Sequence, residues 1–450
     1  MGKDMTQGSI VKVLLLFTIP LVLSGVFQQL FNWVDAFIVG NVEGELSLAS
    51  IGATTAIYNL CITMIVGFTS GISVLSAQHH GKRKFWEMRE TLFSFAFILG
   101  GIFLLVSLLG SVLTTSIVTI LDTPEKLITL ASSYLKIMLL GVPFLAIYNV
   151  YSGVLRGAGD SKAPFVSILI SSLANVVLDI LFVVVLRKGV AGAAAATVIS
   201  QIAMTLFLVF YTERTYSYLK YRLDKKIFEQ KNMMEGTRFG VPPTIQASIS
   251  SMGNIILQRF MNGFGEQTIA AITTAYRVDS VILLPIVNFG SGVATVVAQN
   301  IGAENEERAK RTLKIGLIII AIISLSISLF IFLFGEYLLA MFGLSAASVG
   351  IGKTFFRTLA PFYIIYGFSM VIRGYIEGNG DMVFSSVAGV ISLFARIAGC
   401  YLLVELFAGN VLAIAEGLSW IVLLVLYMVR YWKNNSKKKN GADQTSISSD

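Results

Sequence analysis

The nine residues Ser70-Gly71-Ile72-Ser73-Val74-Leu75-Ser76-Ala77-Gln78 return in the second half of the chain as Ser291-Gly292-Val293-Ala294-Thr295-Val296-Val297-Ala298-Gln299. In both copies a glycine stands three positions after the glutamine, as Gly81 and as Gly302. This repeat decides the fold, because two copies of one sequence pattern predict two halves of similar structure.

The duplication extends outward from this stretch in both directions. Upstream, Pro20 and the residues after it align with Pro242 without a gap. Downstream, Arg156-Gly157-Ala158-Gly159-Asp160 matches Glu377-Gly378-Asn379-Gly380-Asp381. We interpret the glycines of this downstream motif as the end of a helix, and its aspartate as the cap of the next helix.

The composition assigns both copies to a membrane. Charged residues make up 13% of the 450 residues, about half the share of an ordinary soluble domain, whereas hydrophobic residues make up 55%. A membrane span needs about 20 apolar residues, and the apolar runs separate into twelve segments. They lie near residues 10–40, 46–79, 90–121, 127–157, 161–186, 190–212, 236–263, 268–302, 312–342, 347–377, 382–407 and 410–432.

We therefore expect an all-α integral membrane protein with twelve transmembrane helices. Six helices in each copy give the two copies the same orientation. That arrangement predicts two six-helix lobes related by a pseudo-twofold axis along the membrane normal, with a cleft between them as a solute pathway.

Basic residues are distributed unevenly among the connections. Of the 34 Lys and Arg residues, 25 lie in the terminal segments and in the loops after the even-numbered segments, and six lie in the opposite loops. By the positive-inside rule, both termini should lie in the cytoplasm. The expected organisation is an N-terminal lobe at 1–212, a cytoplasmic linker at 213–235, a C-terminal lobe at 236–432 and a disordered tail at 433–450.

Ionisable groups inside a membrane span are costly and usually functional. Asp35 lies on the first segment and Asp179 on the fifth, where Asn175, four residues earlier, shares its helical face. Thr197 follows on the sixth segment, and the helical rise of about 1.5 Å per residue puts all four in the outer layer of the lobe. Two neighbouring buried acids cannot both ionise at low cost, and hard cations prefer oxygen ligands.

We therefore predict a site for H⁺ or Na⁺ at these four residues. The alternative is that they only join helices through hydrogen bonds. The duplication favours the ion site, because acids required by the scaffold should occur in both copies, and these do not. The aligned pairs are Asp35 with Leu257, Asn175 with Arg396 and Asp179 with Cys400.

The order and doubled occurrence of the motifs resemble the multidrug and toxic compound extrusion (MATE) family. The resemblance rests on the opening helix from Pro20 to Asp35, the two Gln-x-x-Gly loop endings and the duplicated Gly-x-Gly-Asp motif, and it covers residues from about 9 to 432. It implies antiport driven by protons or sodium ions and export of amphipathic, often cationic, compounds. It also implies coupling acids in the N-terminal lobe, where Asp35, Asn175, Asp179 and Thr197 stand.

The C-terminal lobe carries its own charges within or beside the predicted spans: Arg259, Arg277, Asp279, Arg396 and Glu416. We interpret them as a structural ion-pair network, although a transport role stays open because Asp279 resembles a second-lobe acid of the family. Candidates for solute contact are polar or soft side chains on helices expected to face the cleft. They are Gln28, Asn32, Tyr58, Asn59, Met64, Tyr148, Asn149, Tyr276 and Asn288.

Other functional classes find little support in the sequence. Cys61 and Cys400 lie far apart in apolar runs, which predicts neither a disulfide nor a cysteine-based metal site. No nucleotide-binding motif is evident, and we expect no cofactor and no enzymatic activity. A flippase for lipid-linked oligosaccharides is the alternative transporter, kept open by the embedded arginines of the C-terminal lobe. We expect a monomer in the plasma membrane that handles small amphipathic molecules and binds no nucleic acid.

Overall fold

The protein is almost entirely helical in the computed structural model, which describes residues 4–222 and 228–447, the side chains of 437–447 excepted. No strand occurs among these residues, so the predicted all-α class is confirmed. The helices of the first half are α1 (Ile10–Glu43), α2 (Glu45–Gly81), α3 (Phe85–Ile120), α4 (Glu125–Gly157), α5 (Lys162–Asp179), η1 (Ile180–Val185), α6 (Gly189–Thr215) and η2 (Ser217–Leu219). Those of the second half are α7 (Gln230–Met261), α8 (Glu266–Ile282), α9 (Leu284–Gly302), α10 (Glu306–Ala340), α11 (Ala346–Leu359), α12 (Phe362–Gly378), α13 (Met382–Phe407), η4 (Ala408–Asn410) and α14 (Val411–Ile447).

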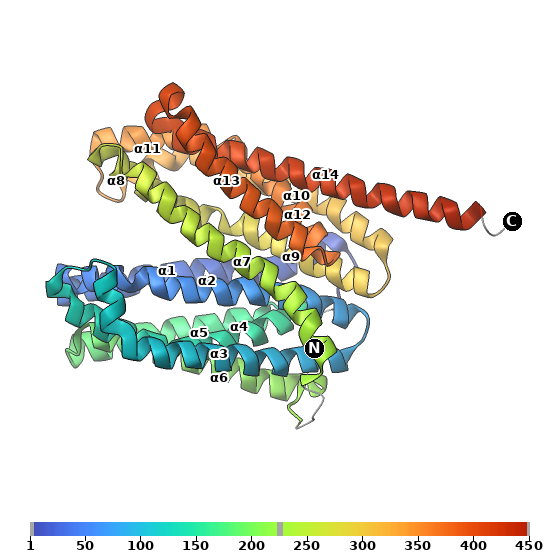
Figure 1. Ribbon diagram of the computed structural model, residues 1–450, viewed down its shortest axis with the longest axis horizontal. Helices are drawn as coiled ribbons and strands as arrows, with labels where there is room; N and C mark the ends of the chain where they lie inside the picture. The colour runs from blue at the N-terminus through green and yellow to red at the C-terminus, as the bar shows by residue number, and fades with distance from the viewer. Residues whose placement is uncertain (1–3, 223–227, 448–450) are drawn as a thin grey trace. The chain divides into compact units, whose positions relative to one another are not determined.

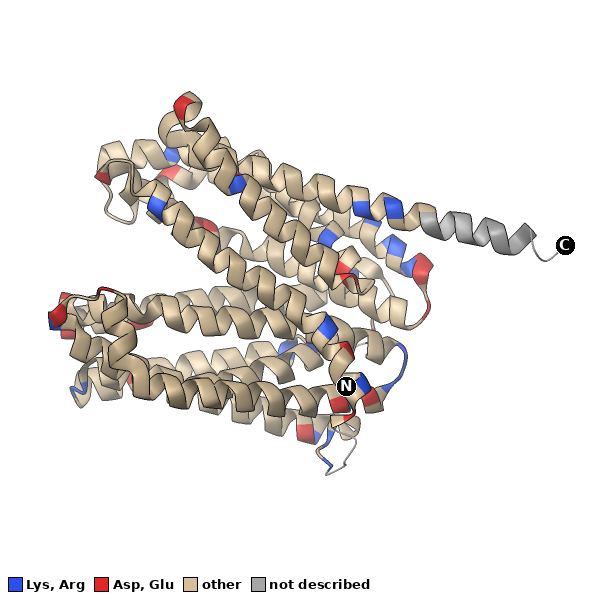
Figure 2. Cartoon of the chain, viewed as in Figure 1, with Lys and Arg blue, Asp and Glu red and all other residues tan. Residues whose placement is uncertain are grey.

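Helical segments correspond to all twelve apolar runs of the sequence. Nine stretches within the described residues are long and apolar enough to cross a membrane, and the pair α11 and α12, bent by 51°, makes a tenth. One of the nine, Met382–Ser436, contains α13 and the part of α14 up to Ser436, while α7 begins with polar and charged residues and is less apolar. Figure 2 shows the charged residues gathered mainly near helix ends, with long uncharged stretches between them.

Three of the predicted helices are interrupted. The run 268–302 divides into α8 and α9 at Leu283, two residues before Pro285, because proline lacks an N–H and its ring clashes with the preceding turn. The run 347–377 bends between α11 and α12, where Pro361 has the same effect. In the run 161–186, α5 ends at Asp179 and the chain continues as the π-helix η1.

The predicted disordered tail, 433–450, begins inside α14. Helix α14 continues past the predicted end of the span as far as Ile447. Residues 448–450 lie outside the described part of the chain.

The chain divides into two compact units. Unit 1 comprises Met1–Ser248 together with Gly302–Glu304, and unit 2 comprises Ile249–Ile301 with Asn305–Asp450. The boundary lies inside α7 rather than in the predicted linker 213–235, of which residues 223–227 lie outside the described part. The reason is the close packing of α7 on α2, where a Cβ atom at Gly71 would lie 2.0 Å from the carbonyl oxygen of Phe239. The first half of α7 therefore belongs to unit 1.

Within unit 1, α4 packs against α2, α3 and α6, while α5 packs against α1 and α6 (Figure 1). The approach of α4 to α2 depends on glycines of α4. A Cβ atom at Gly153 would lie 3.0 Å from the carbonyl oxygen of Thr69, and one at Gly157 would lie 2.8 Å from that of Ser73.

Unit 2 repeats this packing with the equivalent residues. A Cβ atom at Gly374 of α12 would lie 2.4 Å from the carbonyl oxygen of Gly290 on α9, and one at Gly378 would lie 2.8 Å from that of Ala294. The duplicated glycines thus hold equivalent helix pairs in close contact in both units.

The duplicated Gly-x-Gly-Asp motif ends one helix and starts the next, as predicted. Gly159 and Gly380 have φ values of 85° and 90°, in the left-handed region that glycine adopts readily. The Asp160 carboxylate accepts hydrogen bonds from the N–H groups of Lys162 and Ala163, both at 3.0 Å. Asp381 accepts one from the N–H of Phe384 at 3.4 Å.

Apolar side chains cover much of the surface of the span-length helices. In the most apolar stretch of α10 only 17% of the residues are buried, and Ile318, Ile322 and Leu325 are more than half exposed. Exposed apolar surface of this extent is expected where a helix faces lipid rather than water.

Candidate cation-coupling site

Four polar side chains of unit 1 come together where α5 packs against α1 and α6. Asp35 lies on α1 and is half-buried, whereas Asn175 and Asp179 lie on α5 and are fully buried. Thr197 lies on α6 and is half-buried. Because Asn175 and Asp179 are four residues apart, they project from one face of α5. The four residues predicted from the sequence therefore form one cluster.

The amide of Asn175 connects α5 to α6. In the orientation that satisfies both ends of the amide, its nitrogen donates to Asp179 Oδ2 at 2.7 Å and its oxygen accepts from the N–H of Thr197 at 3.0 Å. The Thr197 hydroxyl donates to the carbonyl oxygen of Ala193 at 3.1 Å. Asn175 and Thr197 thus fix the position of the Asp179 carboxyl, and both have their polar groups engaged.

The two carboxyl groups lie within hydrogen-bonding reach of each other. One buried oxygen of each, Oδ1, receives no hydrogen bond from the described protein. No Lys, Arg or His of the described residues forms an ion pair with either group. A carboxylate can only accept hydrogen bonds, and two neighbouring buried carboxylates cannot both stay ionised at low cost.

Aromatic and apolar side chains surround the acid pair. Tyr134 of α4 is buried and lies close to both carboxyl groups. Tyr58 of α2 accepts a hydrogen bond from Gln201 of α6 at 2.7 Å. An apolar cluster packs around them, formed by Val39, Tyr134, Met138, Val183, Val190, Ala193 and Ala194. This packing keeps Asp179 away from water and leaves Asp35 only partly exposed, which raises the cost of leaving their charge uncompensated.

Sequence reasoning missed Tyr134, Gln201 and the π-helix η1. Gln201 lies one helical turn after Thr197, so the spacing on α6 could have identified it. Asp179 is the last residue of α5 before η1 begins at Ile180. Short π-helical segments occur mainly at functional sites, but nothing in the apolar sequence from Ile180 to Val185 indicates one.

Unit 2 holds a different cluster. Arg396 Nη2 forms an ion pair with Glu416 Oε2 at 2.9 Å and donates to the hydroxyl of Tyr276, also at 2.9 Å. Asp279 is buried and accepts a hydrogen bond from the hydroxyl of Tyr363 at 2.5 Å. Arg259 and Arg277 have exposed side chains, so the predicted network of five charges is reduced to Asp279, Arg396 and Glu416.

The nine candidates for solute contact fall into two groups. Exposed side chains on unit 1 belong to Gln28, Asn32, Asn59 and Met64. The other five are half-buried or buried and engaged in hydrogen bonds: Tyr58, Tyr148, Asn149, Tyr276 and Asn288. Asn149 and Asn288 donate to carbonyl oxygens of their own helices, which leaves their amide oxygens for other partners.

The two cysteines and the buried His79 form no further site with other residues that the structure describes. Cys61 and Cys400 are free and buried in separate units. The described residues contain no group of three or more His, Cys, Asp or Glu side chains arranged to hold a metal ion. His79 is buried at the end of α2 and faces Glu235 of α7 at 3.6 Å.

Fold and site together define a duplicated, helical, multi-pass membrane protein with an acid pair in one of its two units. A family model described as MatE matches residues 20–181 and 242–402. The chain is 30% identical over 395 residues, 87% of each chain, to the probable multidrug resistance protein YpnP of Bacillus subtilis (strain 168). It is 22% identical over 427 residues, 93% of this chain and 91% of the relative, to the multidrug export protein MepA of Staphylococcus saprophyticus.

A solved structure described as the outward-facing conformation of a multidrug resistance MATE family transporter has a TM-score of 0.89 at 23% identity. The match covers 97% of this chain and 99% of that one. The chain belongs to the MATE family, whose members are membrane transporters and not enzymes.

Proposed function

We propose that this protein is a cation-coupled antiporter that exports amphipathic, cationic compounds by alternating access. The coupling ion binds at Asp35 and Asp179, and the observation that supports this most strongly is the acid pair itself. Two carboxyl groups within reach of each other, without a basic partner, carry negative charge that a bound cation neutralises. The names of the two relatives, which refer to multidrug resistance and multidrug export, support the substrate class.

The geometry favours a proton over a sodium ion. Asn175 uses both ends of its amide on Asp179 and Thr197, and the buried oxygens Asp35 Oδ1 and Asp179 Oδ1 receive no hydrogen bond from the described protein. Two oxygens are enough to share one proton, whereas a hard metal cation requires more oxygen ligands. A sodium ion would therefore need further oxygen ligands in addition to these two.

Release of the ion changes the force between α1 and α5. With a cation bound, the two carboxyl groups hold the helices together; without it, their like charges repel. Pro20 lies inside α1 and removes a backbone hydrogen bond, which allows the helix to bend. We infer that ion binding reshapes α1, promotes release of the solute on the outer side, and is followed by reloading from the inside.

We further propose that both termini lie in the cytoplasm, that the protein acts as a monomer in the plasma membrane, and that it uses no cofactor besides the coupling ion. The distribution of 25 basic residues on one side against six on the other supports this orientation.

The flippase alternative has less support. It depends on a basic cavity formed by the arginines of unit 2. The charge of Arg396 is balanced by Glu416 at 2.9 Å, and Arg259 and Arg277 have exposed side chains outside that cluster.

The test is accumulation of a cationic dye by proteoliposomes under an imposed pH gradient without sodium, and under an imposed sodium gradient at equal pH. A gradient of about 1.7 pH units is worth about 2.3 kcal/mol per proton, which corresponds to about fifty-fold accumulation when one proton is exchanged for one dye molecule. We expect the pH gradient to drive accumulation and Asp35→Asn to abolish it. The matched control is Asp122→Asn, an exposed loop residue with φ of 53° that asparagine tolerates. Accumulation by Asp35→Asn equal to that of the control would refute the proposal.

A further inference from the structure

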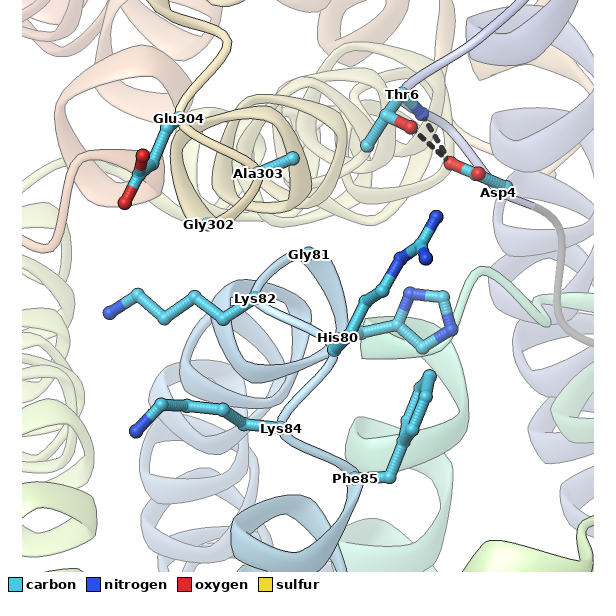
Figure 3. A pocket seen from close by; sticks show the side chains of 11 residues that line it. Asp4, Thr6, His80, Gly81, Lys82, Lys84, Phe85, Gly302, Ala303 and Glu304 are labelled. Atoms are coloured by element: carbon cyan, nitrogen blue, oxygen red, sulfur yellow. Dashed lines mark hydrogen bonds between the residues drawn. The ribbon is translucent and has the colours of Figure 1, made fainter.

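A cavity of about 730 Å³ lies in unit 1 where α2 ends and α3 begins. Its walls are the loop between these helices, the segment that precedes α1, and Gly302–Glu304. None of its residues belongs to the acid pair or its surroundings. Figure 3 shows Lys82 and Lys84 extending to one side of the loop, with His80 and Phe85 on the other side.

The cavity is lined by three consecutive basic residues, Lys82, Arg83 and Lys84. All three are exposed. Lys84 forms an ion pair with Glu87 at 2.9 Å, whereas Lys82 and Arg83 form no ion pair with a described residue. Two cationic groups therefore remain available at the cavity wall.

The fold does not require these charges. Arg83 and Glu304 occupy equivalent positions of the repeat and adopt the same left-handed conformation, with φ of 56° and 59°. The second copy of the loop reads Ala303-Glu304-Asn305 where the first reads Lys82-Arg83-Lys84. Because a loop of the same shape forms without basic residues, the positive charge of the first copy serves something other than folding.

The lining also contains two carboxylates, Asp4 and Glu304. Asp4 is held by Thr6, whose N–H and hydroxyl donate to Asp4 Oδ1 at 2.9 Å and 2.5 Å. Burial acts against ionisation of Asp4, but these hydrogen bonds and the nearby charge of Arg83 lower its pKa. With Lys84 paired to Glu87, the lining holds two unpaired basic side chains, Lys82 and Arg83, and two carboxylates, of which Asp4 is already held by Thr6.

Aromatic side chains beside the cavity indicate the level of lipid headgroups. Phe85 begins α3 and contacts the rings of His80 and Tyr218, with centroid distances of 5.6 Å and 4.6 Å. The adjacent Trp86 is 41% exposed. Tryptophan at the end of an apolar span is typical of the membrane–water interface.

We propose that this cavity binds a phosphate-bearing anion, with Lys82 and Arg83 as its ligands. The ligand is the headgroup of an anionic phospholipid, because basic cavities at the ends of membrane helices suit such headgroups and the aromatic side chains lie beside the cavity. Free inorganic phosphate is the other source of the same chemistry. The alternative explanation is that the basic residues only set the orientation of the loop in the membrane. It requires neither a cavity nor a ligand.

The test measures the thermal unfolding midpoint of the full chain in neutral detergent, titrated with phosphatidylglycerol or, at constant ionic strength, with sodium phosphate. The cavity variant combines Lys82→Gln with Arg83→Gly, because glycine suits the left-handed conformation at position 83. The control variant, Lys310→Gln with Lys314→Gln, removes the same charge from exposed positions of α10. A basic residue near an anionic headgroup contributes about 1 kcal/mol, so we expect about thirtyfold weaker phosphatidylglycerol binding by the cavity variant.

Stabilisation by phosphatidylglycerol that depends on the cavity residues supports a lipid headgroup. Stabilisation by phosphate alone with the same dependence supports the site and assigns it to free phosphate. The proposal is overturned if the cavity variant binds both probes as tightly as the unmodified protein. It is equally overturned if the control variant loses as much affinity as the cavity variant.

Discussion

The two units pack their helices alike and arrange their buried charges differently. In unit 1, Asp35 and Asp179 lie within reach of each other and have no basic partner among the described residues. In unit 2, Arg396 stands where unit 1 has Asn175, and it balances Glu416 at 2.9 Å. The duplication thus preserved the packing and not the electrostatics. We propose that the uncompensated acid pair of unit 1 binds a cation, whereas the charge of Glu416 in unit 2 is already balanced by Arg396.

The largest expected effect is on transport: replacing an acid of unit 1 should abolish coupling, whereas replacing an acid of unit 2 should not. Asp179→Asn should abolish gradient-driven dye accumulation, a drop of up to about fifty-fold at a gradient of about 1.7 pH units, because the amide cannot take up and release a proton. Asp279→Asn should retain most of it, because Tyr363 can still donate to the amide oxygen. Dye accumulation in proteoliposomes measures both. Equal losses of dye accumulation in the two variants would contradict the proposed functional difference between the units.

The second effect is on stability and should occur only in unit 2. Arg396→Met leaves Glu416 buried without its partner, which costs about 3–5 kcal/mol. The double variant Arg396→Met with Glu416→Leu should recover most of that loss, because no uncompensated charge remains. Asp35→Asn in unit 1 should leave stability unchanged or raise it, since it removes a like-charge contact. Reversible unfolding in mixed detergent micelles measures these differences, and a destabilised Asp35→Asn would contradict the comparison.

Much of the fold and part of the site could be predicted from the sequence. The apolar runs and the repeat define the helices and their duplication, and the four-residue spacing of Asn175 and Asp179 defines a shared face. The exposure of Arg259 and Arg277 could not be predicted, because the rotation of a helix about its axis depends on its neighbours. The unit boundary inside α7 could not be predicted either. It depends on the contact of Gly71 with Phe239, which are far apart in the sequence.

A third prediction concerns the shared scaffold, where the units should respond alike. A Cβ atom at Gly157 would lie 2.6 Å from the Cβ of Ser76, and one at Gly378 would lie 2.7 Å from Val297 Cγ1. Gly157→Ala and Gly378→Ala should each cost about 1–3 kcal/mol through overpacking. Gly101→Ala is the control, because that position in α3 is open, and it should stabilise the helix by up to about 1 kcal/mol. A cost confined to one unit, measured by the same unfolding experiment, would show that the two packings are not equivalent.

The smallest difference between the units lies at the two capping aspartates. Asp160 Oδ2 accepts from the hydroxyls of Tyr211 and Tyr216 at 3.0 Å and 2.8 Å. Asp381 Oδ2 instead forms an ion pair with Arg430 Nε at 2.7 Å. Burial, and then the Asp160 carboxylate, raise the pKa of Tyr216, so its hydroxyl remains a donor. One aspartate therefore has neutral partners and the other a charged partner.

Asp160→Asn and Asp381→Asn keep the capping oxygen, because asparagine caps helices as well as aspartate does. Asp381→Asn should still cost about 0.5–1 kcal/mol for the partly exposed ion pair, and that cost should shrink in high salt because mobile ions screen the pair. The cost of Asp160→Asn should not depend on salt, since its partners carry no charge. Unfolding measured at low and high ionic strength separates the two. If the two costs fell equally with salt, the charge of the Arg430 partner would not explain the difference between the two caps.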